Sequence, residues 1–244
     1  MSSSIILSMT ITDSGLKLDQ DETGYRYGPD SFILADFFRN DGSGSVADLC
    51  AGVGVVSILL GFKRPQTEIT AVEIRRSATA LALGNARKSG LSNFSAVTAD
   101  IMSAGNLFKG RPFDCVVSNP PYRKNGSGRI SPDSEKAAAT HEIKMTLSGL
   151  VKASSRILKK NGNLTIIMSF DRLSEYRSIL KEDGFSESRL RVIQADADSP
   201  PKLFLSEARL KTNIKLSVET SFLLRSPGGG DSDELKNIMA RYGL

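Results

Sequence analysis

The sequence predicts an α/β fold in which helices cover both faces of a mostly parallel sheet. From residue 31 onward, segments typical of strands alternate with segments typical of helices. The strand segments are almost continuously apolar, as expected for parallel strands that are buried on both faces. The last strand segments follow one another without an intervening helix, so we expect antiparallel strands at one edge. With 244 residues, 40% of them hydrophobic, the chain is long enough to bury one large core.

The elements are predicted in chain order from apolar periodicity and turn residues. Residues 1–22 are polar and rich in turn residues, which suggests an N-terminal hairpin. The first helix follows the turn Gly28-Pro29-Asp30, with Asp30 or Ser31 as its N-cap. The predicted helices are 31–38, 55–63, 76–90, 136–160, 171–184 and 232–241. The predicted strands are 45–50, 68–74, 94–100, 113–119, 163–169, 188–195, 202–210 and 215–225.

Glycines mark several of these boundaries. Gly90 is the expected C-cap of the helix at 76–90, and Asn161-Gly162 is expected to stop the helix at 136–160. The run Gly228-Gly229-Gly230 predicts a flexible hinge before the last helix. We therefore divide the chain into an N-terminal extension (1–44), a main domain (45–226) and a hinge with a C-terminal helix (227–244).

Composition excludes several classes of protein. No segment has the roughly 20 apolar residues of a membrane span, and the N-terminus lacks the basic start of a secretory signal. The only cysteines, Cys50 and Cys115, lie in apolar surroundings, which excludes a disulfide framework and favours the reducing cytoplasm. A single histidine leaves little material for a metal site, so we expect no metal. The oligomeric state stays open, and a monomer is compatible with the sequence.

The formal net charge of +5 is unevenly distributed along the chain. Residues 1–46 carry 3 basic and 7 acidic side chains, whereas residues 123–160 carry 9 basic and 3 acidic ones. A basic segment of this density fits a polyanionic partner. A solvated helix face is the alternative that charge alone leaves open.

Candidate site residues cluster at the predicted carboxyl ends of four strands, where parallel sheets bind their ligands. In the first group, Asp48–Gly54, the residues Gly52 and Gly54 allow a tight turn and close approach to a ligand. A dinucleotide-binding loop has a third glycine where this chain has Ser57, which weakens a reading as an NAD site. A tight strand–helix turn without a ligand is the alternative.

Two further groups each contribute one carboxylate. Glu73, which lies 21 residues after Gly52, is placed to accept hydrogen bonds from both hydroxyls of a ribose. The alternative is a surface glutamate that pairs with Arg75 or Arg76. Asp100 is placed to accept from an adenine amino group, and its alternative is to cap the following segment.

The fourth group, Asn119-Pro120-Pro121-Tyr122, carries most of the chemical specificity. The two prolines have fixed φ and lack N–H groups, so their carbonyls are rigid acceptors. The Asn119 side-chain oxygen and an acceptor carbonyl beside it together could bind both hydrogens of an exocyclic amine. Tyr122 offers a flat face on which a base or an amide can stack.

Four features follow one another in a characteristic order and spacing: D-x-x-x-G-x-G from Asp48, the acidic strand end at Glu73, Asp100, and N-P-P-Y at 119–122. In this arrangement the chain resembles the S-adenosylmethionine-dependent methyltransferases that act on amino groups. Segments 24–38 and 126–142 resemble the bacterial tRNA methyltransferases that act on N6 of adenine 37 in the valine tRNA anticodon loop. The resemblance covers about residues 20–225. It implies a Rossmann-like class I methyltransferase, with a doubly wound, mostly parallel seven-stranded sheet, antiparallel edge strands and a short N-terminal extension.

The resemblance also implies roles for individual residues. Asp48 to Gly54 would hold the methionine end of the cofactor, Glu73 its ribose and Asp100 its adenine, while part of the N-terminal extension closes over its amino-acid end. The implied cofactor-binding residues are Tyr25, Tyr27, Asp30, Asp48, Cys50, Ala51, Gly52, Gly54, Glu73, Ile74, Asp100, Ile101 and Asn119. The implied catalytic residues are Asn119, Pro120, Pro121 and Tyr122, and the implied RNA-binding residues are Arg123, Lys124 and Arg129. Cys50 stands where the family commonly has glycine, and we expect this small side chain to be tolerated.

The expected reaction is in-line attack of an amine nitrogen on the sulfonium methyl of S-adenosylmethionine, for which the protein mainly orients the reactants. No general base is needed before transfer, and we expect His141 to be structural or to contact RNA. The target base must leave its stack, which costs less in a loop than in a duplex. The alternatives are a glutamine N5-methyltransferase of release factors, a DNA or rRNA adenine-N6 methyltransferase, and a non-catalytic nucleic-acid-binding module.

Overall fold

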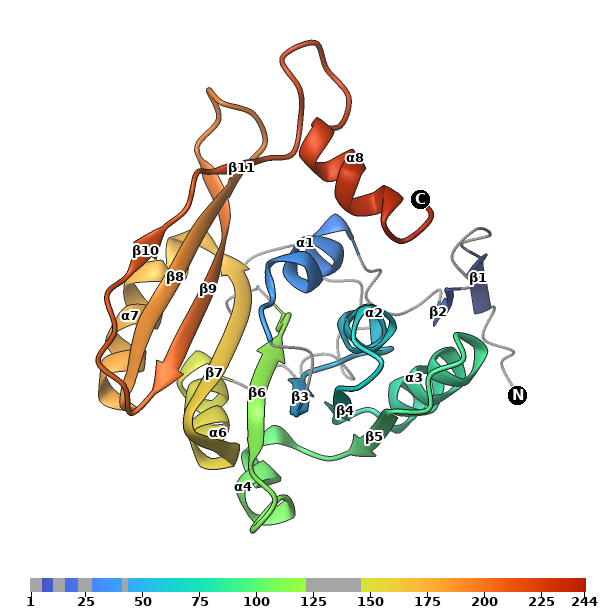
Figure 1. The fold of residues 1–244 in the computed structure, drawn as a ribbon, viewed down its shortest axis with the longest axis vertical. Helices are drawn as coiled ribbons and strands as arrows, with labels where there is room; N and C mark the ends of the chain where they lie inside the picture. Colours follow the sequence, from blue (N-terminus) through green and yellow to red (C-terminus); the bar gives the residue numbers. More distant parts are fainter. Residues whose placement is uncertain (1–5, 11–15, 22–27, 41–43, 122–145) are drawn as a thin grey trace, which may run out of the picture.

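The computed structural model describes residues 6–10, 16–21, 28–40, 44–121 and 146–244, and within them one nine-stranded sheet organises the chain (Figure 1). The strands of this sheet are β3 (Ser45–Leu49), β4 (Glu68–Glu73), β5 (Phe94–Thr98), β6 (Phe113–Ser118), β7 (Leu158–Ser169), β8 (Phe185–Gln194), β9 (Pro201–Leu210), β10 (Ser217–Val218) and β11 (Phe222–Leu223). Their order is β10-β8-β9-β7-β6-β3-β4-β5, and β11 also pairs with β8. The predicted α/β class with a mostly parallel sheet is confirmed, but the implied number of seven strands is wrong, because the two-residue strands β10 and β11 join the seven strands β3 to β9.

The sheet is doubly wound. From β3 the chain moves outward to β4 and β5 and then returns to β6 on the other side of β3, and all these pairs are parallel. The predicted antiparallel pairing is present through β9, which runs antiparallel to both of its neighbours, β7 and β8. It therefore lies two strands inside the edge, while the two-residue strands β10 and β11 pair parallel with β8.

The single strand predicted at 215–225 is therefore wrong, because this segment forms the two separate short strands β10 and β11. Between its two short strands, Glu219 accepts a hydrogen bond from Arg189 Nε at 2.9 Å, and the Thr220 carbonyl accepts one from Arg191 Nε at 2.9 Å. The Glu219 backbone N–H still donates to the Leu190 carbonyl of β8 at 2.8 Å, and side chains of β8 add these two bonds where the regular strand pairing is interrupted.

Helices cover both faces, and each face has its own buried cluster (Figure 1). The helices are α1 (Pro29–Phe37), α2 (Val55–Lys63), α3 (Arg76–Lys88), α4 (Ala104–Leu107), α6 (Leu147–Ile157), α7 (Leu173–Glu182) and α8 (Asp233–Ala240), with short 3₁₀ turns η1 (Ile101–Ser103) and η2 (Phe170–Arg172). One cluster joins α1, α2 and α8, and the other joins α4, α6 and α7. The predicted helices 55–63 and 76–90 are confirmed, and Gly90 takes a φ of +70° beyond the end of α3.

Helix α1 begins earlier than predicted. Its N-cap is Gly28, so the predicted cap at Asp30 or Ser31 is wrong. Pro29 occupies the first turn, where its fixed φ suits a helix and its missing N–H costs nothing. The Asp30 carboxylate instead reaches back along the chain and accepts from the backbone N–H groups of Gly28 (3.1 Å) and Ser31 (3.0 Å).

Helix α6 ends at Ile157, and β7 begins at the next residue, so the predicted helical end at 160 is wrong. Asn161 adopts a φ of +65°, and a Cβ at Gly162 would lie 2.9 Å from the Asp114 carbonyl oxygen. The two residues that suggested a helix stop therefore form an irregularity within β7, where its pairing with β6 shifts register between Phe113 and Cys115. Residues 136–145 of the predicted helix lie outside the described residues.

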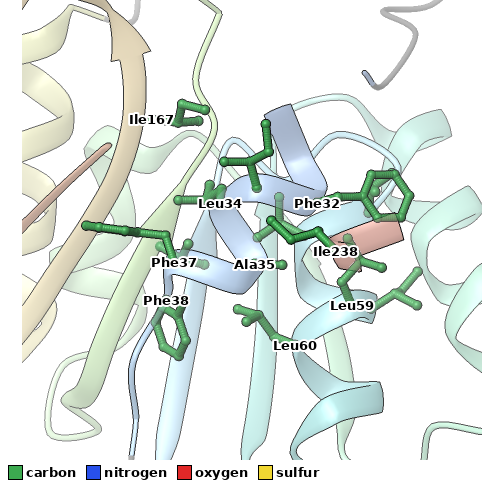
Figure 2. Packing of buried hydrophobic residues seen from close by; sticks show 14 of the residues in the cluster. Phe32, Leu34, Ala35, Phe37, Phe38, Leu59, Leu60, Ile167 and Ile238 are labelled. Atoms are coloured by element: carbon green, nitrogen blue, oxygen red, sulfur yellow. The ribbon is translucent and has the colours of Figure 1, made fainter. Parts of the chain in front are cut away.

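Both ends of the chain pack into the α1–α2 side of the core. The predicted N-terminal hairpin is confirmed as β1 (Ile6–Thr10) paired antiparallel with β2 (Lys17–Asp21). Helix α8, capped by Ser232, buries Ile238 against α1 and α2, as Figure 2 shows. The fully buried ring of Tyr242 stacks edge-on against Phe32, with ring centroids 5.5 Å apart.

Candidate active site

The predicted site residues converge at the point where the winding of the sheet reverses. Strands β6, β3, β4 and β5 are consecutive parallel neighbours, so their carboxyl ends form one edge. A crevice opens at such an edge where neighbouring strands lead to opposite faces, here between β3 and β6. The Ser118 hydroxyl closes the base of this crevice, because it donates to the Leu49 carbonyl at 2.6 Å.

The loop that follows β3 adopts three left-handed backbone conformations. Cys50 has a φ of +62°, Gly52 of +58° and Gly54 of +82°. At Gly54 a side chain is also excluded by contact, because a Cβ there would lie 2.9 Å from the Cβ of Ala82 on α3. Among the described residues, no atom outside the chain neighbours of Gly52 lies within 4 Å of the position that a Cβ there would take, so the backbone faces open space within this part of the chain.

Asp48 holds the start of α2 against the end of β3. Its Oδ2 accepts from the Ser57 backbone N–H at 3.1 Å and from the Ser57 hydroxyl at 2.6 Å. Burial raises the pKa of Asp48 to about 7, although the bonds from Ser57 lower it. Ser57, which replaces the third glycine of a dinucleotide loop, therefore has a structural partner.

Glu73 is fixed by three hydrogen bonds. Its Oε2 accepts from the Gly52 N–H at 3.0 Å, and its Oε1 accepts from both the backbone N–H and Nε of Arg75, each at 3.0 Å. The pairing with Arg75 that the sequence left as an alternative is present, yet Glu73 is buried (6% exposed) and bridges the glycine loop to β4. Because each carboxylate oxygen has two lone pairs, Oε2 retains the capacity to accept one more bond.

The remaining strand-end residues line the same edge. Asp100 caps η1, accepting from the Met102 N–H at 2.9 Å, so its alternative role as an N-cap is also present. Ile101, one residue on, is buried, while Ile74 and Ala51 are half-buried beside Glu73 and Gly52.

Asn119, directly after β6, is oriented by helix α1. Its Nδ2 donates to Asp30 Oδ2 and to Ser31 Oγ, each at 3.2 Å. Because the amide hydrogens point toward α1, the amide oxygen Oδ1 lies on the opposite arm of the side chain. Pro120 is buried and Pro121 is exposed. The contact with Asn119 places Asp30 against the start of the Asn119-Pro120-Pro121-Tyr122 motif, a position that its sequence did not indicate.

The electrostatics of this edge favour a cation. The pKa of the Cys50 thiol is raised by burial and by the nearby carboxylates of Glu73, Asp48 and Asp100. The thiol is therefore protonated at neutral pH and is a poor nucleophile. Three carboxylates around one loop suit a ligand that carries positive charge.

Sequence reasoning missed Ser31, Ser118 and the role of Ser57, because single serines carry no motif. The signal for Ser31 was its place beside Asp30 at a helix start. The predicted residues outside the described part of the chain are Tyr25, Tyr27, Tyr122, Arg123, Lys124, Arg129 and His141. Among the described residues, no group of three side chains is arranged to hold a metal ion, and no helix has the length and apolarity to cross a membrane.

Comparison with known proteins gives a consistent result. The model of the methyltransferase small domain family matches residues 28–194. A tRNA1(Val) (adenine(37)-N6)-methyltransferase from Porphyromonas gingivalis is 31% identical over 224 residues, which cover 88% of this chain and 87% of that protein. Protein Atu636 from Agrobacterium tumefaciens, a predicted O-methyltransferase, has a similar fold with a TM-score of 0.68 at 18% identity, covering 86% of this chain and 94% of that one. SMU.776, complexed with SAH, matches with a TM-score of 0.59 at 12% identity, covering 86% of this chain and 57% of that one.

Proposed function

The chain belongs to the methyltransferase small domain family, and on that premise we propose that it uses S-adenosylmethionine to methylate N6 of adenine 37 in the anticodon loop of a valine tRNA. The name and 31% identity of the Porphyromonas relative support this substrate. The observation that carries the proposal is the Asn119 amide, held by Asp30 and Ser31 at the switch point of the sheet. An acceptor in this position is suited to an exocyclic amine.

The cofactor fits the glycine loop. The open space above Gly52 admits a ligand against the backbone, and the carboxylates of Glu73 and Asp100 offset the positive charge of a sulfonium and an ammonium group. Asp48, whose pKa is raised to about 7 by burial, adds to this negative charge when it is ionised. We assign Glu73 to the ribose through Oε2, and Asp100 with Ile101 to the adenine. When bound, S-adenosylmethionine supplies a methyl group on a sulfonium leaving group.

The protein orients the target amine. The Asn119 Oδ1 and the Pro120 carbonyl accept the two N6 hydrogens, which draws the nitrogen lone pair out of conjugation with the ring and toward the methyl group. No general base is required before transfer, because the methylated nitrogen becomes acidic. We assign Tyr122 to stacking beneath the base.

The RNA contacts complete the proposal. Arg123, Lys124 and Arg129 follow the amine-binding motif and would meet phosphates around the flipped base. A tRNA substrate also supports our proposal that the enzyme acts in the cytoplasm.

The test is methyl transfer to defined substrates. We expect labelling of a valine tRNA transcript, loss of labelling when adenine 37 is replaced by guanine, and N6-methyladenosine as the product. A release factor and an adenine-containing DNA duplex should stay unlabelled. Robust labelling of the release factor with none of the tRNA would refute the substrate.

A matched variant tests the site itself. Asn119→Ala should lower kcat by at least 100-fold, the typical effect of losing one such transition-state contact, while the Kd of S-adenosylmethionine changes little. Equal loss of both would mean that Asn119 supports the fold or the cofactor instead.

A further inference from the structure

A second hollow lies at the opposite edge of the sheet. It has a volume of about 1030 Å³ and is lined by the starts of β6 and β7, the end of β9 and the C-terminal ends of α1, α2 and α8. The strand β3, of five residues, separates this edge from the active-site edge by about 17 Å. We call this hollow the basal basin.

The basal basin is strongly basic. Nine lysine or arginine residues line it, against three aspartate or glutamate residues. This surplus of six exceeds the net charge of +5 of the whole chain. It includes Lys159 and Lys160, which the sequence grouped with the basic segment at 123–160 but which the fold places away from Asn119.

Part of this charge has a structural role. Lys63 and Arg241 share Asp36 at 3.0 and 2.6 Å, and both lie at helix ends, where cations offset the helix dipole. Lys159 pairs with Asp114 at 2.7 Å. These cations are explained by the fold itself.

Four other basin cations have no acidic partner among the described residues, and one of them, Arg64, lies at the C-terminal end of α2, where the helix-end argument applies. Arg64, Lys160, Arg209 and Lys215 form no ion pair within the part of the chain that the structure describes. Lys160 and Arg209 lie on strands, and Lys215 lies in the connection after β9, so the helix-end argument does not apply to them.

Two of these arginines also have buried nitrogens without acceptors. Arg64 Nη1 and Arg209 Nε are inaccessible to solvent and have no hydrogen-bond partner among the described residues. Burial lowers the pKa of Arg64. Arg64 does have one acceptor, since its Nη2 donates to the Phe38 carbonyl at 2.9 Å, but a buried nitrogen that has lost water and gained no acceptor is costly to the fold. An anion in the basin would offset that cost.

We propose that the basal basin binds backbone phosphates of the substrate tRNA at positions outside the anticodon stem-loop. This inference rests on the proposed function, because it extends the same RNA to a second contact. The hollow is large, and cations that are accessible to solvent line it. The distance between the hollow and the active site is short compared with the length of a folded tRNA. One substrate could therefore contact both edges of the sheet.

The test compares two charge-matched double variants. Lys160→Ala with Lys215→Ala removes two exposed basin cations that lie outside the candidate site and form no ion pair with the described residues. Lys181→Ala with Lys202→Ala removes two exposed lysines outside the basin and is the control. The substrates are the full-length valine tRNA and its isolated anticodon stem-loop.

We expect the basin variant to lower kcat/KM about tenfold on full-length tRNA and to leave the stem-loop unchanged. The slope of log K against log salt for tRNA binding should fall by about 1.5, since each lost phosphate contact removes roughly 0.7–0.9. The control variant should behave as the wild type. An unchanged slope, an equal loss on both RNAs or an equal loss in the control would overturn the inference.

Two further outcomes separate the two proposals. If the wild type methylates no tRNA but the basin variant still lowers the salt dependence of tRNA binding, the proposed function is refuted and the proposal that the basin binds tRNA is supported. If tripolyphosphate raises the melting temperature of the wild type but not of the basin variant, while tRNA binding is unaffected, the basin belongs to a small oligophosphate and the tRNA assignment is overturned.

Discussion

The contact between Asp30 and Asn119 predicts a specific loss of catalysis in the variant Asp30→Asn. In the native protein a carboxylate oxygen accepts from Asn119 Nδ2 at 3.2 Å, and the other oxygen binds the N–H groups of Gly28 and Ser31. An asparagine at position 30 that keeps its oxygen on those two N–H groups presents its own NH₂ to Asn119. Two donors then face each other, and the Asn119 amide is driven to turn its NH₂ toward the substrate amine.

The size of the effect follows from the bonds involved. A hydrogen bond to a charged group contributes about 1.5–3 kcal/mol, which corresponds to a fall in kcat of about 10- to 150-fold. Ser31→Ala removes only a neutral acceptor at 3.2 Å, worth about 0.5–1.5 kcal/mol, and should lower kcat by about 2- to 12-fold. Both variants should retain nearly native affinity for S-adenosylmethionine, because the groups that we assign to the cofactor are elsewhere.

The assay is steady-state methyl transfer to tRNA, with cofactor affinity measured separately by titration calorimetry. A reciprocal pair sharpens it. Asn119→Asp alone sets two carboxylates against each other and should be nearly inactive, whereas Asn119→Asp with Asp30→Asn restores a donor facing an acceptor and should recover at least tenfold. The sequence resemblance assigned Asp30 to the cofactor. If Asp30→Asn weakens cofactor binding tenfold at unchanged kcat, the positioning argument is refuted and that assignment holds.

Two further predictions concern stability. Cys50 has a left-handed backbone conformation, which costs a non-glycine residue about 1–2 kcal/mol. The variant Cys50→Gly should therefore be more stable than Cys50→Ala by about 1 kcal/mol, or about 2–4 °C in melting temperature. Equal stability of the two variants in calorimetry would contradict backbone strain at this position. The pKa of Asp48 is raised from 3.8 to about 7, so between these pH values the native state binds one proton more than the unfolded state. The free energy of unfolding should therefore fall as the pH rises from about 4 to 7, and this group contributes up to about 1.4 kcal/mol per pH unit. Asp48→Asn should flatten that slope in urea titrations across the range, and an unchanged slope would mean that Asp48 ionises normally.

The strand ends of the site were predictable because they depend only on local pattern and on sheet topology. Continuous apolar runs located the strands, and parallel winding brings the residues after them to one edge. Asp48, Glu73, Asp100 and Asn119 therefore lie where their sequence positions indicated. The sequence left two interpretations for Glu73 and for Asp100, a bond to a ligand or a bond to a neighbouring residue. The neighbouring bond is present in each case, since Arg75 binds Glu73 and Asp100 caps η1.

What could not be predicted are contacts between elements that are remote in sequence. Asp30 and Asn119 are 89 residues apart, and their contact requires the start of α1 to lie over the end of β6. That position is set by packing, since α1 buries Phe32, Leu34 and Ala35 against α2, α8 and the sheet (Figure 2). No periodicity along the chain encodes it.

Charge shows the same dependence on topology. A count along residues 123–160 treats the segment as one surface, but each parallel strand of a doubly wound sheet ends at one edge and the next begins at the opposite edge. Lys159 and Lys160 belong to the start of β7, so they enter the basal basin although the segment begins just after the Asn119 motif. The active-site edge keeps the three carboxylates that suit a cationic cofactor, and the far edge gathers the cations that suit phosphate. In the complex that we propose, this separation of charge across the sheet attracts the RNA without drawing its phosphates into the cofactor site.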